Sequence, residues 1–479
     1  MALIVGVVGG MLAIFFAGFY ALRFVTAERD KRRRLMAAAL FMTATLSPIV
    51  VTLLSPRTGG ASGFTEFSDA PQSPTVSAII KGVGYFFLVA VVLLAIIRTR
   101  VVLPYPAAAV ALVAYAVVGW VSSLINFQRA SIDLFYPALA VTGVLAASAM
   151  TFATALRLSR ATLRIYVYLS LVLAVVAPQI AFWDGQGRTW YGFSQLAGVT
   201  THPNGMGTVA ALAVIVELVR MEGLKRPRIW HLVAAVVALL GTQSRGAWLS
   251  AAIGLLLYLT FRSGARWVMI LLPVVMISLL AASTLLENVF DALTHWSAGG
   301  DISTLNGRTT IWANALGAVS RNPVFGTGPR SFDLEYRSSV LGLGNLISSS
   351  NAHNQFVQTL VERGVVGLMI LTVFLVALTG YALRVGHHPT RAGLVAVVAV
   401  FVSRFAVETP LNISTASLNG ALLVVVTVLL ASSKSEHRLQ PIAENPRGVR
   451  PPDAYWKSKL LRAPSRTSED RTVALNGRP

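Results

Sequence analysis

Four segments of this sequence carry side chains of the types that catalyse group transfer. They are residues 201–205, 242–246, 306–308 and 350–358, and each stands beside or between long apolar runs. Guanidinium groups bind phosphates through paired, charge-assisted hydrogen bonds, and a neutral imidazole accepts a proton near pH 7. Together these residue types predict proton transfer beside an anionic group.

His353 is the candidate general base. It has amide neighbours, among them Asn354, and it stands at the entrance to an apolar helix with Glu362 a few turns further on. An imidazole, with an ordinary pKa of about 6.5, is suited to taking a proton from a hydroxyl. His202, followed closely by Asn204, is a second imidazole on the same side, although Pro and Asn-Gly there fit a plain turn and helix start equally well.

Arg245 and Arg308 are the candidate anion ligands. Arg245 lies between Ser244 and Gly246, and an arginine near hydrocarbon costs about 2.5–3.5 kcal/mol on insertion scales. Gly246 would let a ligand approach the backbone, and a helix start there would add N–H donors; a side chain that reaches lipid head groups is the alternative. Arg308 precedes an expected amphipathic helix, and Arg330 ends a Gly- and Pro-rich turn that could shape a pocket.

The elements that must position these residues are membrane helices. The 479-residue chain is 55% hydrophobic and 13% charged, which excludes a soluble enzyme, a disordered protein and a disulfide scaffold. It has no cysteine, so thiolate nucleophiles and Cys-ligated metals are excluded. The net charge is +20, but the apolar runs favour a lipid bilayer, and not nucleic acid, as the partner.

Thirteen apolar runs approach the length of about 20 residues that a membrane-spanning helix needs. They begin near residues 3, 35, 79, 107, 137, 165, 206, 230, 247, 267, 365, 393 and 418. The stretch 230–261 is too long for one span and is interrupted at 243–246, so we expect two helices that meet in a tight turn. The sequence therefore predicts an all-α integral membrane protein, a bundle of about 12–13 transmembrane helices with a long outer loop that contains short helices.

The basic residues predict the orientation. Alternate loops and the tail hold 29 of the 40 basic residues, and the segment 157–164 is one of these loops; the opposite loops hold nine. The positive-inside rule then puts the N-terminus outside and the C-terminus in the cytoplasm, which requires thirteen helices. All four polar segments fall on the outer side. No basic residue precedes the first apolar run, so we expect no cleaved signal peptide.

The same map suggests three parts. We expect N-terminal transmembrane helices in 1–200, a catalytic membrane region in 201–432 with an outer loop at about 285–364, and a basic, disordered cytoplasmic tail in 433–479.

Taken together, the polar segments resemble the O-antigen ligase and O-antigen polymerase family of bacterial envelope proteins. The resemblance covers about residues 200–383. It is carried by Ser244-Arg245-Gly246, Gly307-Arg308 with Ile311-Trp312, the turn Gly326-Thr327-Gly328, and Ala352-His353-Asn354 with Glu362 and Gly364. Ligases and polymerases share these motifs, so the resemblance does not separate the two.

The resemblance implies an inverting glycosyltransferase at the outer face of the bacterial inner membrane that needs neither metal nor cofactor. Its donor would be a glycan on undecaprenyl pyrophosphate, and its acceptor a hydroxyl of a glycan or glycolipid. Arg245 and Arg308 match the arginines that engage the pyrophosphate, and His353 matches the catalytic histidine. Further residues expected to contact the substrate are Ser244, Gly246, His202, Asn204, Asn354, Arg330 and Glu362.

A secondary transporter or a flippase for lipid-linked glycans is the alternative from a different class. Such proteins place ionisable groups deep in the membrane as relays, and here the candidates are Lys81, Glu217 and Arg404 with Glu408. We expect Arg404 and Glu408 to form an ion pair near the outer end of their helix, where they could line the same cavity.

Two further readings stay open. A polyprenyl-phosphate sugar transferase would use carboxylates in the first outer loop, where this chain offers Glu66 and Asp69. A structural scaffold in an envelope-building complex would need no site at all.

Overall fold

The computed structural model describes residues 29–54, 106–128, 134, 138, 141, 151–183, 194–200, 202–219, 229–263, 308–341, 351–384, 388–411 and 418–439. The predicted spans that begin near residues 3, 79 and 267 lie outside these ranges, as does most of the span near 137. The chain divides into two units, Met1–Glu436 and His437–Pro479, and the contacts discussed below belong to the first.

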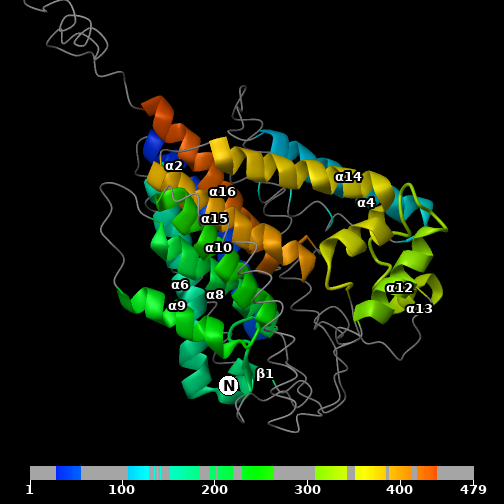
Figure 1. Ribbon diagram of the computed structural model, residues 1–479, viewed down its shortest axis with the longest axis horizontal. Coiled ribbons are helices and arrows are strands. Elements are labelled where there is room, and N and C mark those ends of the chain that lie inside the picture. The colour runs from blue at the N-terminus through cyan, green and yellow to red at the C-terminus, as the bar shows by residue number, and fades with distance from the viewer. Residues whose placement is uncertain are drawn as a thin grey trace, which may run out of the picture. The chain divides into compact units, whose positions relative to one another are not determined.

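Helices make up most of the described chain (Figure 1). In order they are α2 (Arg29–Leu54), α4 (Pro106–Ile125), α6 (Phe152–Val176), α7 (Pro178–Ala181), α8 (Pro203–Leu218), α9 (Ile229–Gly241), α10 (Arg245–Ser263), α12 (Arg308–Val319), α13 (Leu334–Leu341), α14 (Gln355–Arg384), α15 (His388–Ser403), the 3-10 turn η4 (Arg404–Ala406) and α16 (Leu418–Leu439). Strands β1 (Phe182–Trp183) and β2 (Gln195–Leu196) form a small antiparallel pair. The predicted all-α class is confirmed.

Among the described residues, three helices are long and apolar enough to cross a bilayer. They are α6, α14 and Ala107–Ile125 of α4. The exposed large side chains of α14 include Val365, Met369, Val373 and Val376, which recur at helical spacing. Such an apolar stripe on the outside of a helix is what lipid requires, because hydrocarbon offers no partners to polar groups.

The stretch 230–261 forms two helices, as predicted. α9 ends at Gly241 and α10 begins at Arg245, with Gln243 in the left-handed region (φ 51°) of the turn between them. Trp248 Nε1 donates to the Leu239 carbonyl across this turn at 2.8 Å. The interruption by polar residues is therefore a sharp reversal of the chain.

α8 lies at the centre of the first unit. It contacts α6, α9, α10 and α15, and almost all its side chains from Met206 to Glu217 are buried. A small residue allows α15 to pack closely against the end of α8. A Cβ at Gly393 of α15 would lie only 2.6 Å from Cγ2 of Val219, the residue that follows α8. α8 thereby fixes where the segment 202–204, at its N-terminal end, must lie.

The assignment of 157–164 to a loop is wrong, because these residues are helical turns of α6. The buried Arg160 donates to the Val219 carbonyl at 2.5 Å, and Arg164 binds Glu217 through two hydrogen bonds of 2.6 and 2.8 Å. Charged residues usually mark loops, but here the end of α8 supplies the carbonyls and the carboxylate that allow two arginines in a packed helix.

α14 is broken at Gly364, where it contacts the segment that contains α12 and α13. Gly364 (φ 62°, ψ −164°) leaves the helical conformation, so backbone groups near it lose their partners within the helix. The loop between α12 and α13 replaces them: Thr327 N donates to Val361 O at 2.7 Å, and Val365 N donates to Pro323 O at 2.9 Å. α14 also packs along α4 and against α12 (Figure 1).

Candidate active site

His353 stands in a tight turn just before α14. Its φ of 48° is left-handed, and its N–H donates to Asn351 Oδ1 at 2.7 Å. Asn354 caps the helix by accepting from Phe356 N at 2.9 Å, while its Nδ2 donates to the Ala406 carbonyl at 3.1 Å. The amides predicted beside His353 thus shape its turn and tie it to η4.

The carboxylate of Glu408 joins His353 to two other segments. Its Oε2 lies 3.6 Å from His353 Nδ1, and the two side chains are 20% and 19% exposed. Its Oε1 accepts from Asn204 Nδ2 at 2.5 Å and lies 3.7 Å from Arg404 Nη2. Three side chains therefore meet at the carboxylate of Glu408: Asn204 from the start of α8, His353 from the turn before α14 and Arg404 from η4.

Glu408 is anionic at any physiological pH. Burial raises its pKa, but the interaction with His353 and the positive charge of Arg404 outweigh burial and bring the pKa to about 2. A carboxylate held beside an imidazole orients the ring and stabilises its protonated form. The pair therefore has the arrangement of a general base with its orienting acid.

His202 serves as the N-cap of α8. Its Nδ1 accepts from the backbone N–H of Asn204 at 3.1 Å, and its ring lies edge-on to Trp183 with centroids 5.0 Å apart. Burial is the main cause that brings its pKa down to about 4, against the opposing effect of Glu408. The ring is consequently neutral at pH 7.

The turn before α10 packs on the start of α8. Ser244 Oγ donates to Asn204 Oδ1 at 2.8 Å. A Cβ at Gly246 would lie 2.8 Å from Arg404 Nη1. An arginine of the protein itself therefore makes a close approach at Gly246, and a ligand contact there stays a prediction.

Arg404 is a buried cation with incomplete pairing. Its side chain is 1% exposed, and within the described part of the chain its Nε and Nη1 have no hydrogen-bond partner. Nη2 donates to the Asn204 carbonyl at 3.4 Å. A buried guanidinium in this state is costly, and the nearby Glu408 offsets only part of the cost. The sequence pointed to this pair through two opposite charges one helical turn apart in an apolar stretch, but not to its contact with His353.

The two predicted anion ligands lie at helix starts. Arg308 is the first residue of α12; its Nη1 donates to the Val407 carbonyl at 3.3 Å, and its charge helps to lower the pKa of His202. Arg245 is the first residue of α10, and its side chain is exposed. Its chain neighbours Ser244 and Gly246 lie within the cluster, so Arg245 stands at its edge.

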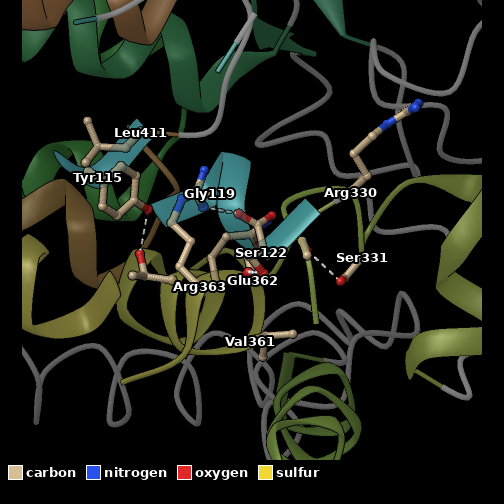
Figure 2. A network of polar contacts seen from close by, with 12 residues as sticks. Tyr115, Gly119, Ser122, Arg330, Ser331, Val361, Glu362, Arg363 and Leu411 are labelled. Carbon is tan, nitrogen blue, oxygen red and sulfur yellow. Dashed lines mark hydrogen bonds and ion pairs between the residues drawn. The ribbon is translucent and has the colours of Figure 1, made fainter. Parts of the chain in front are cut away.

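Two predicted substrate contacts, Glu362 and Arg330, make their side-chain hydrogen bonds outside this cluster. Glu362 is 3% exposed and hydrogen-bonds to Gln358 and Arg363 inside α14. Arg330 Nε binds Asp333 Oδ2 at 2.7 Å, and its side chain points away from the buried network around Arg363 (Figure 2).

The cluster around Glu408 is cationic. Arg245, Arg308 and Arg404 outnumber the one carboxylate, which suits a substrate with about two negative charges. Among the described residues, no three His, Asp or Glu side chains are grouped so as to hold a metal ion. The arrangement can bind an anion, hold a hydroxyl and take its proton.

Comparison with known proteins supports the resemblance drawn from the sequence. Residues 230–372 match the family model described as O-Antigen ligase. This segment contains Arg245, Arg308 and His353 and ends before Arg404 and Glu408. The chain is also 26% identical over 206 residues to the Exopolysaccharide production protein ExoQ of Rhizobium meliloti (strain 1021), and the match covers 39% of this chain and 46% of that relative. Residues 230–372 are thus similar to an O-antigen ligase domain, and the long apolar helices support a multi-pass bacterial membrane protein.

Proposed function

We propose that the protein is a metal-independent, inverting glycosyltransferase of the O-antigen ligase or polymerase type. It transfers a glycan from undecaprenyl pyrophosphate to a hydroxyl of a glycan or glycolipid at the outer face of the inner membrane. The observation that carries the proposal is the meeting of His353 and Glu408 beside Arg308 and the turn that bears Arg245. The region 201–432 is its catalytic part.

His353 acts as the general base. Because Nδ1 faces Glu408, the ring keeps its proton on Nδ1 and presents Nε2 to the acceptor hydroxyl. As the hydroxyl oxygen attacks the anomeric carbon, its proton passes to Nε2, and Glu408 stabilises the resulting imidazolium. The glycosidic bond to the pyrophosphate breaks with its electron pair on the phosphate oxygen.

Arg308 and Arg245 bind the pyrophosphate. The leaving group gains negative charge as the bond breaks, so guanidinium groups hold it more tightly in the transition state than in the ground state. The exposed side chain of Arg245 can turn towards a ligand, and Arg308 lies at the N-terminal end of α12, where the helix dipole also favours an anion. Buried Arg404 adds positive charge behind them.

The decisive experiment incubates the purified protein in proteoliposomes with lipid-linked oligosaccharide and candidate acceptors. We expect glycan transfer or chain extension with release of lipid pyrophosphate, in the absence of any ion gradient. His353→Ala should lower turnover by on the order of 100-fold or more, and Glu408→Gln by at least about 10-fold. Arg308→Ala should weaken transfer strongly as well.

Matched substitutions lie outside the cluster. His231 is half-buried and hydrogen-bonds to Tyr168, and Arg321 is exposed and donates to the Val340 carbonyl. His231→Ala and Arg321→Ala should leave turnover near that of the wild type. Full turnover in His353→Ala would contradict the proposal, and transport that depends on an ion gradient, without any transfer, would favour the secondary transporter or flippase.

The carboxylates of the acidic-loop alternative, Glu66 and Asp69, lie outside the described residues. Replacing both with Ala in the same assay tests that alternative. Lost transfer in this double variant, with His353→Ala unaffected, would support it.

A further inference from the structure

The first turns of α14 carry a buried polar stripe where a membrane helix is expected to be apolar. Its members follow one helical face, and each is at most 3% exposed: Gln355, Gln358, Thr359 and Glu362. Burying polar groups is costly unless each has a partner, so a continuous stripe of them calls for a physical reason. Nothing in the proposed chemistry uses these four side chains directly.

Gln355 connects α4 to the segment that follows Glu408. Its Oε1 accepts from the backbone N–H of Leu411 at 2.8 Å, and its Nε2 donates to Tyr115 Oη and to Thr359 Oγ1, both at 3.1 Å. Leu411 is three residues beyond Glu408. The side chain therefore anchors the backbone that carries the carboxylate.

Gln358 anchors the backbone next to His353, the other member of the His353–Glu408 pair. Its Oε1 accepts from the N–H of Ala352, the residue before His353, at 2.7 Å. Its Nε2 donates to Glu362, which in turn binds Arg363. The network thus reaches from the His353 turn into the interior of α14.

The part of α14 that bears the two glutamines is itself held against α4. The Arg363 guanidinium lies over the Tyr115 ring, 4.3 Å from its centroid, and beside Gly119 (Figure 2). Ser122 Oγ donates to the Glu362 carbonyl at 2.8 Å. Both glutamines therefore project from a part of α14 that is locked to a neighbouring helix.

From these contacts we infer that Gln355 and Gln358 are positioning residues for the proposed transfer reaction. One holds the segment of Glu408 and the other holds the turn of His353 against the same helical face, and together they set the distance between imidazole and carboxylate. Glutamine suits this task because one side chain supplies an acceptor and a donor at once. The inference rests on the proposed function of His353.

The test compares near-isosteric substitutions of buried polar residues, of which only the two at the glutamines remove an anchor of a catalytic segment. Gln355→Met and Gln358→Met keep the side-chain length and remove the bonds to Leu411 and Ala352. Thr359→Val removes buried bonds to Tyr115 and Gln355 but touches neither catalytic segment. We expect both methionine variants to lower kcat by about 10–100-fold with donor KM nearly unchanged, and Thr359→Val to keep kcat. Thermal unfolding of all three reports their stability.

The pH profile of kcat separates positioning from simple destabilisation. The charged groups around His353 are Glu408, Arg308 and Arg404, with His202 close by. A nearby carboxylate raises the pKa of an imidazole, so a loosened Glu408 should move the acidic limb to lower pH in Gln355→Met and leave it in place in Thr359→Val. If Gln355→Met does not accumulate, Gln358→Met is tested alone on kcat.

The results distinguish this inference from the proposed function. If His353→Ala is inactive while the methionine variants match Thr359→Val in kcat and pH profile, the positioning role is refuted and the transferase stands. If His353→Ala is fully active, both are refuted.

Discussion

The side chains at the centre of the site come from positions far apart in the chain. Asn204 Nδ2 and Glu408 Oε1 form a 2.5 Å hydrogen bond across 204 positions, and His353 joins them from the start of a third helix. Each residue by itself has an ordinary structural explanation, as a helix cap or an ion pair. Their meeting at one carboxylate gives the chemistry, because a base needs both an orienting partner and a place for an anion beside it.

His202 makes the stability of the protein sensitive to acid. Its pKa is about 4 in the folded protein and about 6.5 when exposed, so the unfolded chain binds an extra proton between these values. The free energy of unfolding should therefore fall as the pH drops from about 6.5 towards 4, by about 1–3 kcal/mol.

His202→Asn tests this effect while keeping a side chain that caps helices well. Thermal unfolding in detergent at pH 7.5 and pH 5 should show a smaller loss of stability for the variant than for the wild type. Equal losses in the two proteins would mean that His202 does not bind the extra proton. Glu408, whose pKa is about 2, is ionised at both pH values and therefore contributes no difference in stability between them.

At the scale of elements, the break in α14 explains how one helix serves both membrane and site. After Gly364 the helix exposes apolar side chains, and before Gly364 lies the buried polar stripe, from which Gln355 and Thr359 hydrogen-bond to Tyr115 of α4. The combination φ 62°, ψ −164° is open to glycine and strained for other residues. A Cβ there would also collide with the Val324 carbonyl of the loop between α12 and α13.

Gly364→Ala should therefore destabilise the protein, by on the order of 2–4 kcal/mol, and lower transfer activity with it. Gly380, in the same helix, has no atom within 4 Å of an added Cβ, so Gly380→Ala should be neutral or slightly stabilising. Thermal unfolding of both purified variants measures the difference. A Gly364→Ala protein as stable as Gly380→Ala would show that the break is dispensable.

Local patterns in the sequence predict the helices well and their meeting points poorly. Apolar length and the polar interruption in 230–261 are local features, and α9 and α10 follow them. The contact of Glu408 with His353 depends on how α8, α14 and α15 pack, which no spacing encodes. The loop predicted for 157–164 is wrong for a related reason. The arginines of this segment bond to acceptors at the end of α8, which lie far from them in the sequence.

At the scale of the whole molecule, the proposed chemistry requires the start of α14 to face outward. After the break at Gly364, residues 365–384 form 20 helical residues, about 30 Å at 1.5 Å per residue, which is enough to cross a hydrocarbon core of about 30 Å. Because alternate loops hold the excess of basic residues, we expect the Arg384 end in the cytoplasm and the His353 end outside.

The chain has no cysteine, so single cysteines can report this orientation without a prior deletion. Ser320, at the end of α12, and Arg384 are both exposed. An impermeant maleimide added to right-side-out spheroplasts should label Ser320→Cys at once and Arg384→Cys only after the membrane is opened. The reverse pattern would place His353 in the cytoplasm, where the lipid-linked donor proposed above is not presented, and the outward-facing transferase would have to be abandoned.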